Sequence, residues 1–347
     1  MHRQGTVTLS ATLAIFLFIT AAVVSAVAAV RLSTHADSIS RNTKLSGFLA
    51  GTLLLAVATS LPELTATISA SVIGNADIAV GNGLGSLLFN IFVLFALDIY
   101  FRKKRLFLTV SHDHTYTGII ALLLSTVAAA GLYLQSNLTL AGISMTSLAI
   151  AVIYILGIWF VSKKKPQAEE EESGQAEEKN DAASSAQHQK ENTASSVKGF
   201  LLFAVIIFIS GSALSITGDI MANTTGISAT AVGSILVALA TSIPDAVGVF
   251  VALRLANANM AIGAILGSNI FNIAVIVIGD LFYQKNSIWT DTEDQTILVA
   301  GAGFFLTVLV MVIIKRDHTR NSFTYILPSL IAVTGYIAFL ISIIAAG

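Results

Sequence analysis

The chain has 347 residues, of which 55% are apolar and only 11% are charged, and its mean hydropathy is +0.81. An ordinary soluble domain is about 25% charged, so this composition indicates a membrane protein with many spans. The net charge of −1 gives no basic field for nucleic acid. The lack of cysteine excludes disulfides, thiolate metal sites and cysteine nucleophiles.

Ten apolar stretches are long enough to cross a bilayer, which takes about 20 residues as a helix. The sequence therefore predicts an all-α polytopic membrane protein with ten transmembrane helices. A cleavage-like triplet, Ala26-Val27-Ala28, would also fit a signal peptide, but the length of the first stretch favours a retained span. The approximate bounds of the ten stretches are 8–30, 47–72, 77–101, 115–134, 138–161, 199–221, 227–254, 259–283, 296–314 and 323–346.

The segment 163–198 is rich in Glu, Lys, Ser, Ala and Gln. Such a composition cannot bury a core, so we expect a disordered linker between one transmembrane unit at 1–162 and a second at 199–347. If both termini lie outside, 17 of the 19 Lys and Arg residues fall on the inner side. The positive-inside rule thus predicts a cell (inner) membrane protein with a cytoplasmic linker and external termini.

The chain contains the same pattern twice. Ala58-Thr-Ser-Leu-Pro-Glu63 recurs 182 residues later as Ala240-Thr-Ser-Ile-Pro-Asp245. Such a register indicates an internal duplication. Each half has five predicted spans, an odd number, so the second copy is expected to be inverted (5+5), as in secondary transporters with a midplane substrate site. The same ungapped offset pairs Asp37 with Asp219, Asn75 with Asn257, Gly85-Ser86 with Gly267-Ser268, Phe89-Asn90-Ile91 with Phe271-Asn272-Ile273, and Asp98 with Asp280.

Glu63 and Asp245 each lie about two-thirds along a predicted span. A carboxylate at the bilayer centre costs roughly 2.5–3.5 kcal/mol on insertion scales. The predicted spans hold no Lys or Arg deep in their interior, so the expected partner of these carboxylates is a transported cation.

Further oxygen donors accompany both carboxylates. The hydroxyls of Thr59 and Ser60 come one helical turn before Glu63, and Pro62 lacks an N–H, which predicts a broken helix with a freed carbonyl near Ala58. Six to eight oxygen ligands and two negative charges suit Ca²⁺, whereas soft metals would need thiolate or imidazole. The equivalent or supporting positions are Thr241, Ser242 and Pro244, together with the i, i+4 pairs Ser86 with Asn90 and Ser268 with Asn272.

These paired motifs resemble the two α-repeats of the cation/Ca²⁺ exchanger superfamily, and most of all its prokaryotic Na⁺/Ca²⁺ exchanger-like branch. The resemblance covers nearly the whole chain. It implies antiport of Ca²⁺ for Na⁺ by alternating access, in which the first and sixth spans slide, with no cofactor. The implied partners are Ca²⁺, Na⁺ and the lipid bilayer, and a monomer is compatible with the sequence. The implied ligands are Glu63, Asp245, Thr59, Ser60, Ser86, Asn90, Thr241, Ser242, Ser268 and Asn272, with carbonyls near Ala56 and Ala238.

Two departures leave the coupling ion open. Members often carry Glu at the position of Asp245, and an Asp there resembles the K⁺-dependent exchangers. Asn272 stands where sodium-coupled members often carry Asp. Coupling to H⁺ or K⁺, or another divalent substrate, are therefore alternatives, although the motifs differ from the Gly-Asn-x-x-Glu of the H⁺-coupled branch. A channel is a further alternative. An enzyme is not expected, because Gly218-Asp219 and Gly279-Asp280 lack the Gly-x-Gly-Asp pattern of intramembrane aspartyl proteases.

Four other acids lie near the ends of predicted spans. Asp98 precedes Arg102 by four residues, which predicts a salt bridge at the membrane interface, and its repeat equivalent is Asp280. Asp37 and Asp219 lie near the ends of predicted spans and are candidates for capping or gating.

Overall fold

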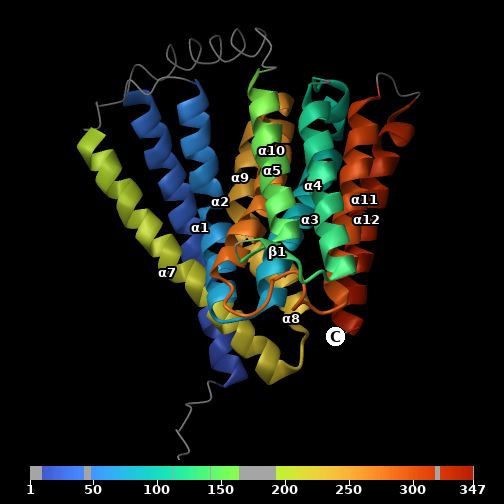
Figure 1. The fold of residues 1–347 in the computed structure, drawn as a ribbon. Helices are drawn as coiled ribbons and strands as arrows, with labels where there is room; N and C mark the ends of the chain where they lie inside the picture. The colour runs from blue at the N-terminus through green and yellow to red at the C-terminus, as the bar shows by residue number, and fades with distance from the viewer. Residues whose placement is uncertain are drawn as a thin grey trace, which may run out of the picture.

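The computed structural model describes residues 10–42, 48–111, 113–140, 142–163, 193–316 and 321–346. Long helices dominate this part of the chain and lie side by side in a bundle (Figure 1). Residues 164–192, most of the predicted linker, lie outside the described residues. The long helices are α1 (Ala11–Asn42), α2 (Phe48–Val72), α3 (Ala76–Tyr100), α4 (His114–Leu134), α5 (Met145–Lys163), α7 (Thr193–Thr225), α9 (Ala238–Arg254), α10 (Ala258–Phe282), α11 (Gln295–Ile314) and α12 (Ser322–Ala346).

Short elements join or extend these helices. Two 3₁₀ turns, η1 (Arg102–Lys104) and η2 (Leu106–Leu108), follow α3. Strands β1 (Thr139–Leu140) and β2 (Ile143–Ser144) form an antiparallel hairpin before α5. The single turn α8 (Ala229–Ala231) and a π-helical segment, η3 (Val232–Val237), lead directly into α9.

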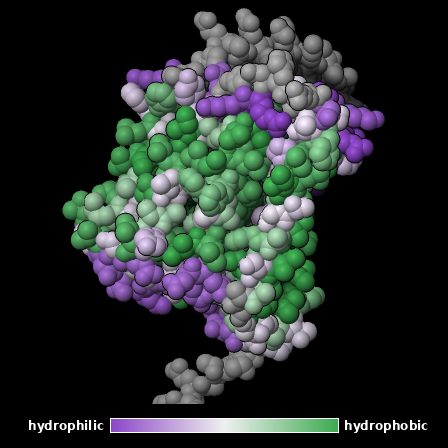
Figure 2. Space-filling model, turned by 90° about the vertical axis from the view of Figure 1, so that its right-hand side faces the viewer, coloured by the Kyte–Doolittle hydropathy of each residue, from purple (hydrophilic) through white to green (hydrophobic). Residues whose placement is uncertain are grey.

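The surface has the character of a membrane protein. Within the described residues, eight helical segments are long and apolar enough to cross a bilayer, and Met145–Val161 of α5 is a shorter apolar helix. A broad hydrophobic zone separates hydrophilic surfaces at the two ends of the molecule (Figure 2). The molecule is therefore a mostly helical, multi-pass membrane protein.

The two copies of the pattern are inverted relative to each other. On the interface of α3 and α10, Gly83 faces Ile276, whereas Asn90 faces Asn269, so these equivalent helices run antiparallel. The same holds for α1 and α7, where His35 stacks on Phe203 at 5.7 Å and Ser38 hydrogen-bonds Ser196 at 2.8 Å.

The repeat register also extends to details that the motifs do not show. Asn75 caps α3 through a bond from Ile78 N (2.9 Å), and its equivalent Asn257 caps α10 through a bond from Met260 N (2.8 Å). Helix caps of this kind satisfy backbone donors that have no partner within the helix. Both copies therefore start their central helix with the same residue in the same role.

Two buried carboxylates fasten each repeat to the last helix of the other. Asp98 of α3 accepts hydrogen bonds from Tyr325 and Ser329 of α12, the latter at 2.7 Å. Asp280 of α10 accepts a bond of 2.7 Å from Ser147 of α5. Ser147 and Ser329 are themselves 182 residues apart, so the two clasps are repeat equivalents.

The predicted salt bridge between Asp98 and Arg102 is wrong. Asp98 is buried and its two oxygens are used by hydroxyl groups, whereas Arg102 is exposed. A neutral hydroxyl partner carries a smaller desolvation cost than a buried arginine would. Asp280, whose role the sequence left open, takes the equivalent structural position with additional bonds from Ser144 (2.9 Å) and Ser287 (3.2 Å).

Three predicted boundaries were wrong. The helix α1 continues to Asn42, beyond the predicted end at 30, and α7 begins at Thr193 inside the predicted linker. Polar residues extend both helices because they pair across the interface, as Ser38 and Ser196 do. The fifth helix starts at Met145 instead of 138, because a hairpin with Gly142 at a φ of 82° precedes it.

Small residues allow α3 to touch the backbone of η3. A Cβ at Gly81 would lie 2.9 Å from Ser234 N, and a Cβ at Gly233 would lie 2.7 Å from Ile78 Cα. A Cβ at Gly85 would overlap the Ser234 backbone. This contact brings the second repeat's site-bearing segment against the centre of the first repeat.

We predict that Gly85→Ala destabilises the protein, because the new methyl group meets main-chain atoms that cannot rotate away. Overpacking of this kind typically costs about 1–3 kcal/mol. The matched control is Gly267→Ala at the equivalent position of α10, where no described atom lies within 4 Å of the added Cβ. Thermal unfolding in detergent should show a lower Tm for the first variant only, and equal Tm values would contradict this packing.

Candidate functional site

The centre of the bundle brings together the two carboxylates that the sequence singled out. Glu63 on α2 has an exposed fraction of 0%, and Asp245 on α9 has one of 8%. The charges lie close enough for Asp245 to act on Glu63 electrostatically. No Lys or Arg of the described residues is bonded to either carboxylate.

Each carboxylate is contacted by hydroxyl groups of the other repeat. Ser242 donates a hydrogen bond of 2.9 Å to Glu63 Oε1, and Thr241 makes a further side-chain contact with Glu63. Thr59, the repeat equivalent of Thr241, contacts Asp245. The paired Thr-Ser segments therefore act across the repeat interface and connect α2 with α9.

The amide group of Asn90 connects α3 to the second repeat. Its Nδ2 lies 3.3 Å from Asp245 Oδ2, 3.3 Å from Ser268 Oγ and 3.2 Å from Asn269 Oδ1. Ser268 also donates a short hydrogen bond of 2.5 Å to Asp245 Oδ2. Side chains from α3 and α10 therefore orient the carboxylate of Asp245.

Several buried oxygen atoms at this centre have no hydrogen-bond partner. They are Glu63 Oε2, Ser86 Oγ, Asn90 Oδ1 and Asn272 Oδ1, each on a residue that is fully buried. An unsatisfied buried polar group costs about 1–3 kcal/mol, so four such groups on neighbouring helices lower the stability of the fold substantially. All four belong to predicted ligands, and a cation would satisfy them. The residues present thus fit a hard cation.

The remaining predicted ligands occupy the same region with varied surroundings. Ser60 is buried on α2 beside the motif. The carbonyl oxygen of Ala238 accepts a hydrogen bond of 3.2 Å from Thr241 Oγ1, so it faces the site. Ala56 lies in residues 48–57 of α2, a stretch whose side chains are outside the described part of the structure.

The predicted breaks at the prolines did not form. Both α2 and α9 continue as helices through Pro62 and Pro244. The irregular backbone instead precedes the second motif, as the π-helical segment η3 that ends at Val237. A π segment shifts the hydrogen-bond ladder without a kink at proline, and such segments are frequent at functional sites.

Two residues of the site were not predicted from the sequence. Asn82 of α3 donates to Glu63 O (3.0 Å) and to Thr67 Oγ1 (2.9 Å), and it accepts from Thr241 (3.1 Å). Asn269 of α10 contacts Asn90. Their repeat equivalents are Ala264 and Leu87, so a search for matched polar pairs cannot find them. The signal that could have found them is the rarity of amide side chains in an apolar span.

Comparison with known proteins identifies the family of the chain. The sequence pattern of the family described as sodium/calcium exchanger protein matches residues 13–163 and 195–345. The inner membrane protein YrbG of Escherichia coli (strain K12) is 28% identical over 251 residues, which cover 71% of this chain and 73% of that protein.

Two solved structures share the fold. The H⁺/Ca²⁺ exchanger CAX gives a TM-score of 0.61 at 13% identity, covering 95% of this chain and 88% of that one. The sodium-calcium exchanger NCX_Mj, soaked with Na⁺ and Sr²⁺, gives a TM-score of 0.55 at 20% identity, covering 96% and 99%. Because the family pattern covers both repeats, the chain belongs to the sodium/calcium exchanger protein family and is a membrane antiporter of that family.

Proposed function

We propose that this protein is a secondary-active antiporter that exchanges Ca²⁺ for Na⁺ by alternating access. The observation that carries the proposal is the pair Glu63 and Asp245, one from each repeat, buried together beside unpartnered oxygen atoms. Two negative charges balance one divalent cation, and carboxylate, amide and hydroxyl oxygens are the ligands that Ca²⁺ prefers. The ligand set is the one that the sequence predicts, with Asn82 and Asn269 as supporting residues.

The proposal includes ten spans arranged as 5+5. Eight helical segments of the described residues are long and apolar enough to cross a membrane, and α2 and α5 would be the other two spans. With the N-terminus outside, the positive-inside count places the linker in the cytoplasm and both termini outside. In support, the first residues of α1 and the end of α12 lie toward the same end of the bundle (Figure 1).

Coupling follows from exclusive occupancy of one site. Ca²⁺ and the coupling ions compete for the same carboxylates, so an empty site keeps uncompensated buried charge and disfavours closure of both mouths. The transporter then crosses between states only when loaded. This requirement is what distinguishes an antiporter from a channel.

The inverted repeats supply two related gates. At one end of the bundle, Asn75 Nδ2 donates a hydrogen bond of 2.7 Å to Asp219 Oδ1, joining the α3 start to α7. We infer that this bond closes the outer mouth. The repeat equivalents Asn257 and Asp37 would form the corresponding bond at the inner mouth in the alternate state, as α1 and α7 slide together. Asp37 and Asp219 therefore receive gating roles.

Na⁺ is favoured over H⁺ as the coupling ion by the motifs. Thr59-Ser-Leu-Pro-Glu63 differs from the Gly-Asn-x-x-Glu pattern of the H⁺-coupled branch. The alternative is H⁺- or K⁺-coupled exchange of Ca²⁺ or another divalent cation, which Asp245 and Asn272 favour, since fewer or shorter carboxylates weaken simultaneous binding of several Na⁺ ions.

We predict that Glu63→Gln abolishes Ca²⁺ uptake, because one of the two compensating charges is lost while the side chain keeps its size. Removing one partner of a buried charged contact typically costs about 2–5 kcal/mol, so Ca²⁺ affinity should fall roughly 30-fold or more. Uptake of radioactive Ca²⁺ by proteoliposomes measures it. Asp113→Asn, an exposed acid outside the site, is the control. If Glu63→Gln transports Ca²⁺ as well as the wild type does, the assignment of the cation site to Glu63 is wrong.

Asn272→Leu should separate stability from function. Both amide atoms of Asn272 lack partners, so an apolar side chain of similar size removes a buried penalty of about 1–3 kcal/mol. We expect a higher Tm in Ca²⁺-free buffer together with weaker Ca²⁺ binding. Asn82→Leu is the matched control, because the amide group of Asn82 makes hydrogen bonds through both its nitrogen and its oxygen. The loss of these bonds should lower the Tm. A lower Tm for both variants would argue against an unsatisfied site.

The coupling ion is tested by changing one gradient at a time. Proteoliposomes loaded with Na⁺ and diluted into Na⁺-free buffer are expected to accumulate Ca²⁺, because Na⁺ carried outward is released on the outer side and frees the shared carboxylates there for external Ca²⁺. A pH gradient of equal driving force, without Na⁺, should give only background uptake. Equal uptake under the pH gradient would assign the protein to H⁺-coupled exchange instead.

A further inference from the structure

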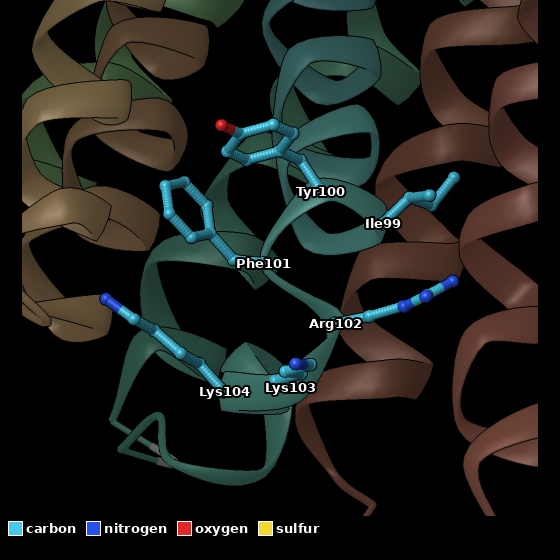
Figure 3. A pocket seen from close by; sticks show the side chains of 6 residues that line it. All are labelled: Ile99, Tyr100, Phe101, Arg102, Lys103 and Lys104. Carbon is cyan, nitrogen blue, oxygen red and sulfur yellow. The ribbon is translucent and has the colours of Figure 1, made fainter.

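We propose that the end of α3 binds the phosphate headgroup of an anionic phospholipid. The site, here called the basic pocket, is a cavity of about 460 Å³ between the turns after α3 and the first turn of α12. A second cavity of about 410 Å³ adjoins it along Ile99 to Lys104 (Figure 3). The basic pocket is lined by Arg102, Lys103, Arg105, Ser322, Phe323, Tyr325 and Ile326.

Three cations line this pocket without an acidic partner among the described residues. Within the described ranges, Arg102, Lys103 and Arg105 are exposed, and no acidic side chain is bonded to them. The acid closest in sequence, Asp98, is turned into the bundle and bonded to Tyr325 and Ser329. Lys104, which lines the adjoining cavity, donates to Leu253 O of α9 at 2.9 Å. The like charges of the other three therefore favour an external anion.

The backbone holds these cations in a fixed arrangement. Arg105 lies between the two 3₁₀ turns with φ 48° and ψ 57°, a left-handed conformation that a residue other than glycine adopts rarely. Leu106 and Phe107 directly after it are buried and anchor the loop. Figure 3 shows Arg102 extending toward the helices of one side and Lys104 toward those of the other.

Apolar groups at the pocket favour a lipid over a free anion. Phe323 and Ile326 line the cavity, and neither could contribute to binding of inorganic phosphate. Tyr100 is 72% exposed and Phe323 is 64% exposed, which suits aromatic residues at the headgroup level of a membrane. Basic pockets between transmembrane helices on the cytoplasmic side are typical sites for anionic headgroups. The acyl chains would then run along the apolar surface of α12.

The test compares two double variants of the whole protein. Arg102→Gln with Lys103→Gln removes two cations of the basic pocket. Arg31→Gln with Lys198→Gln is the charge-matched control, because both residues are exposed and lie on α1 and α7 instead. Each protein is purified in detergent and titrated with phosphatidylglycerol or with phosphatidylcholine of the same acyl chains. Native mass spectrometry then counts the bound lipid.

We expect wild type and control to bind phosphatidylglycerol in preference to phosphatidylcholine. The pocket variant should bind it roughly 30-fold more weakly, since each cation near an anionic lipid surface contributes about fivefold. Phosphatidylglycerol should also raise the Tm of wild type but not of the pocket variant, because Tyr325 both lines the pocket and fastens Asp98. Equal lipid binding by the pocket variant and the control would overturn the proposal.

Two further arms separate other occupants. Displacement of phosphatidylglycerol by inorganic phosphate at similar concentration would show a free-anion site and overturn the lipid assignment. The acidic run Glu169 to Glu172 is the rival occupant within this chain. If the wild type binds no phosphatidylglycerol but a variant with these four residues changed to Gln does, the acidic run of the linker occupies the pocket. This result would overturn the lipid proposal.

Discussion

Two carboxylates placed side by side in a low-dielectric interior repel each other and lose the solvation that water would give them. Glu63 and Asp245 are in this situation, each buried and each without a basic partner among the described residues. Hydroxyl and amide donors from both repeats orient the pair but do not neutralise it. A bound cation would neutralise the pair, and in the proposed function this is why the polar side chains of α2, α3, α9 and α10 converge on one point.

The inverted duplication is what brings the two charges together. Because equivalent helices run antiparallel, a motif two-thirds along α2 meets its copy on α9 near the middle of the bundle. The clasps of Asp98 with α12 and of Asp280 with α5 connect each repeat to the last helix of the other. These clasps lie away from the site, so the central helices are held together while α1 and α7 pack at the edge of the bundle (Figure 1).

Much of this arrangement could be predicted from the sequence, because the bilayer and the duplication are strong constraints. Ten apolar stretches gave the helices, and the fixed offset gave the matched polar residues around Glu63 and Asp245. Features that depend on tertiary contacts could not be predicted. The polar extension of α1 forms only because α7 pairs with it, and the hydroxyl partners of Asp98 come from a helix more than 200 residues away. Asn82 and Asn269 break the two-fold pattern, so the repeat itself concealed them.

The most direct test of a shared carboxylate site is equilibrium binding of radioactive Ca²⁺ to the purified protein in detergent. The account predicts one Ca²⁺ per chain, displaced competitively as Na⁺ rises, with binding lost when Asp245 is changed to Asn. Undiminished Ca²⁺ binding by Asp245→Asn, or simultaneous binding of Ca²⁺ and the coupling ion at saturation, would contradict it.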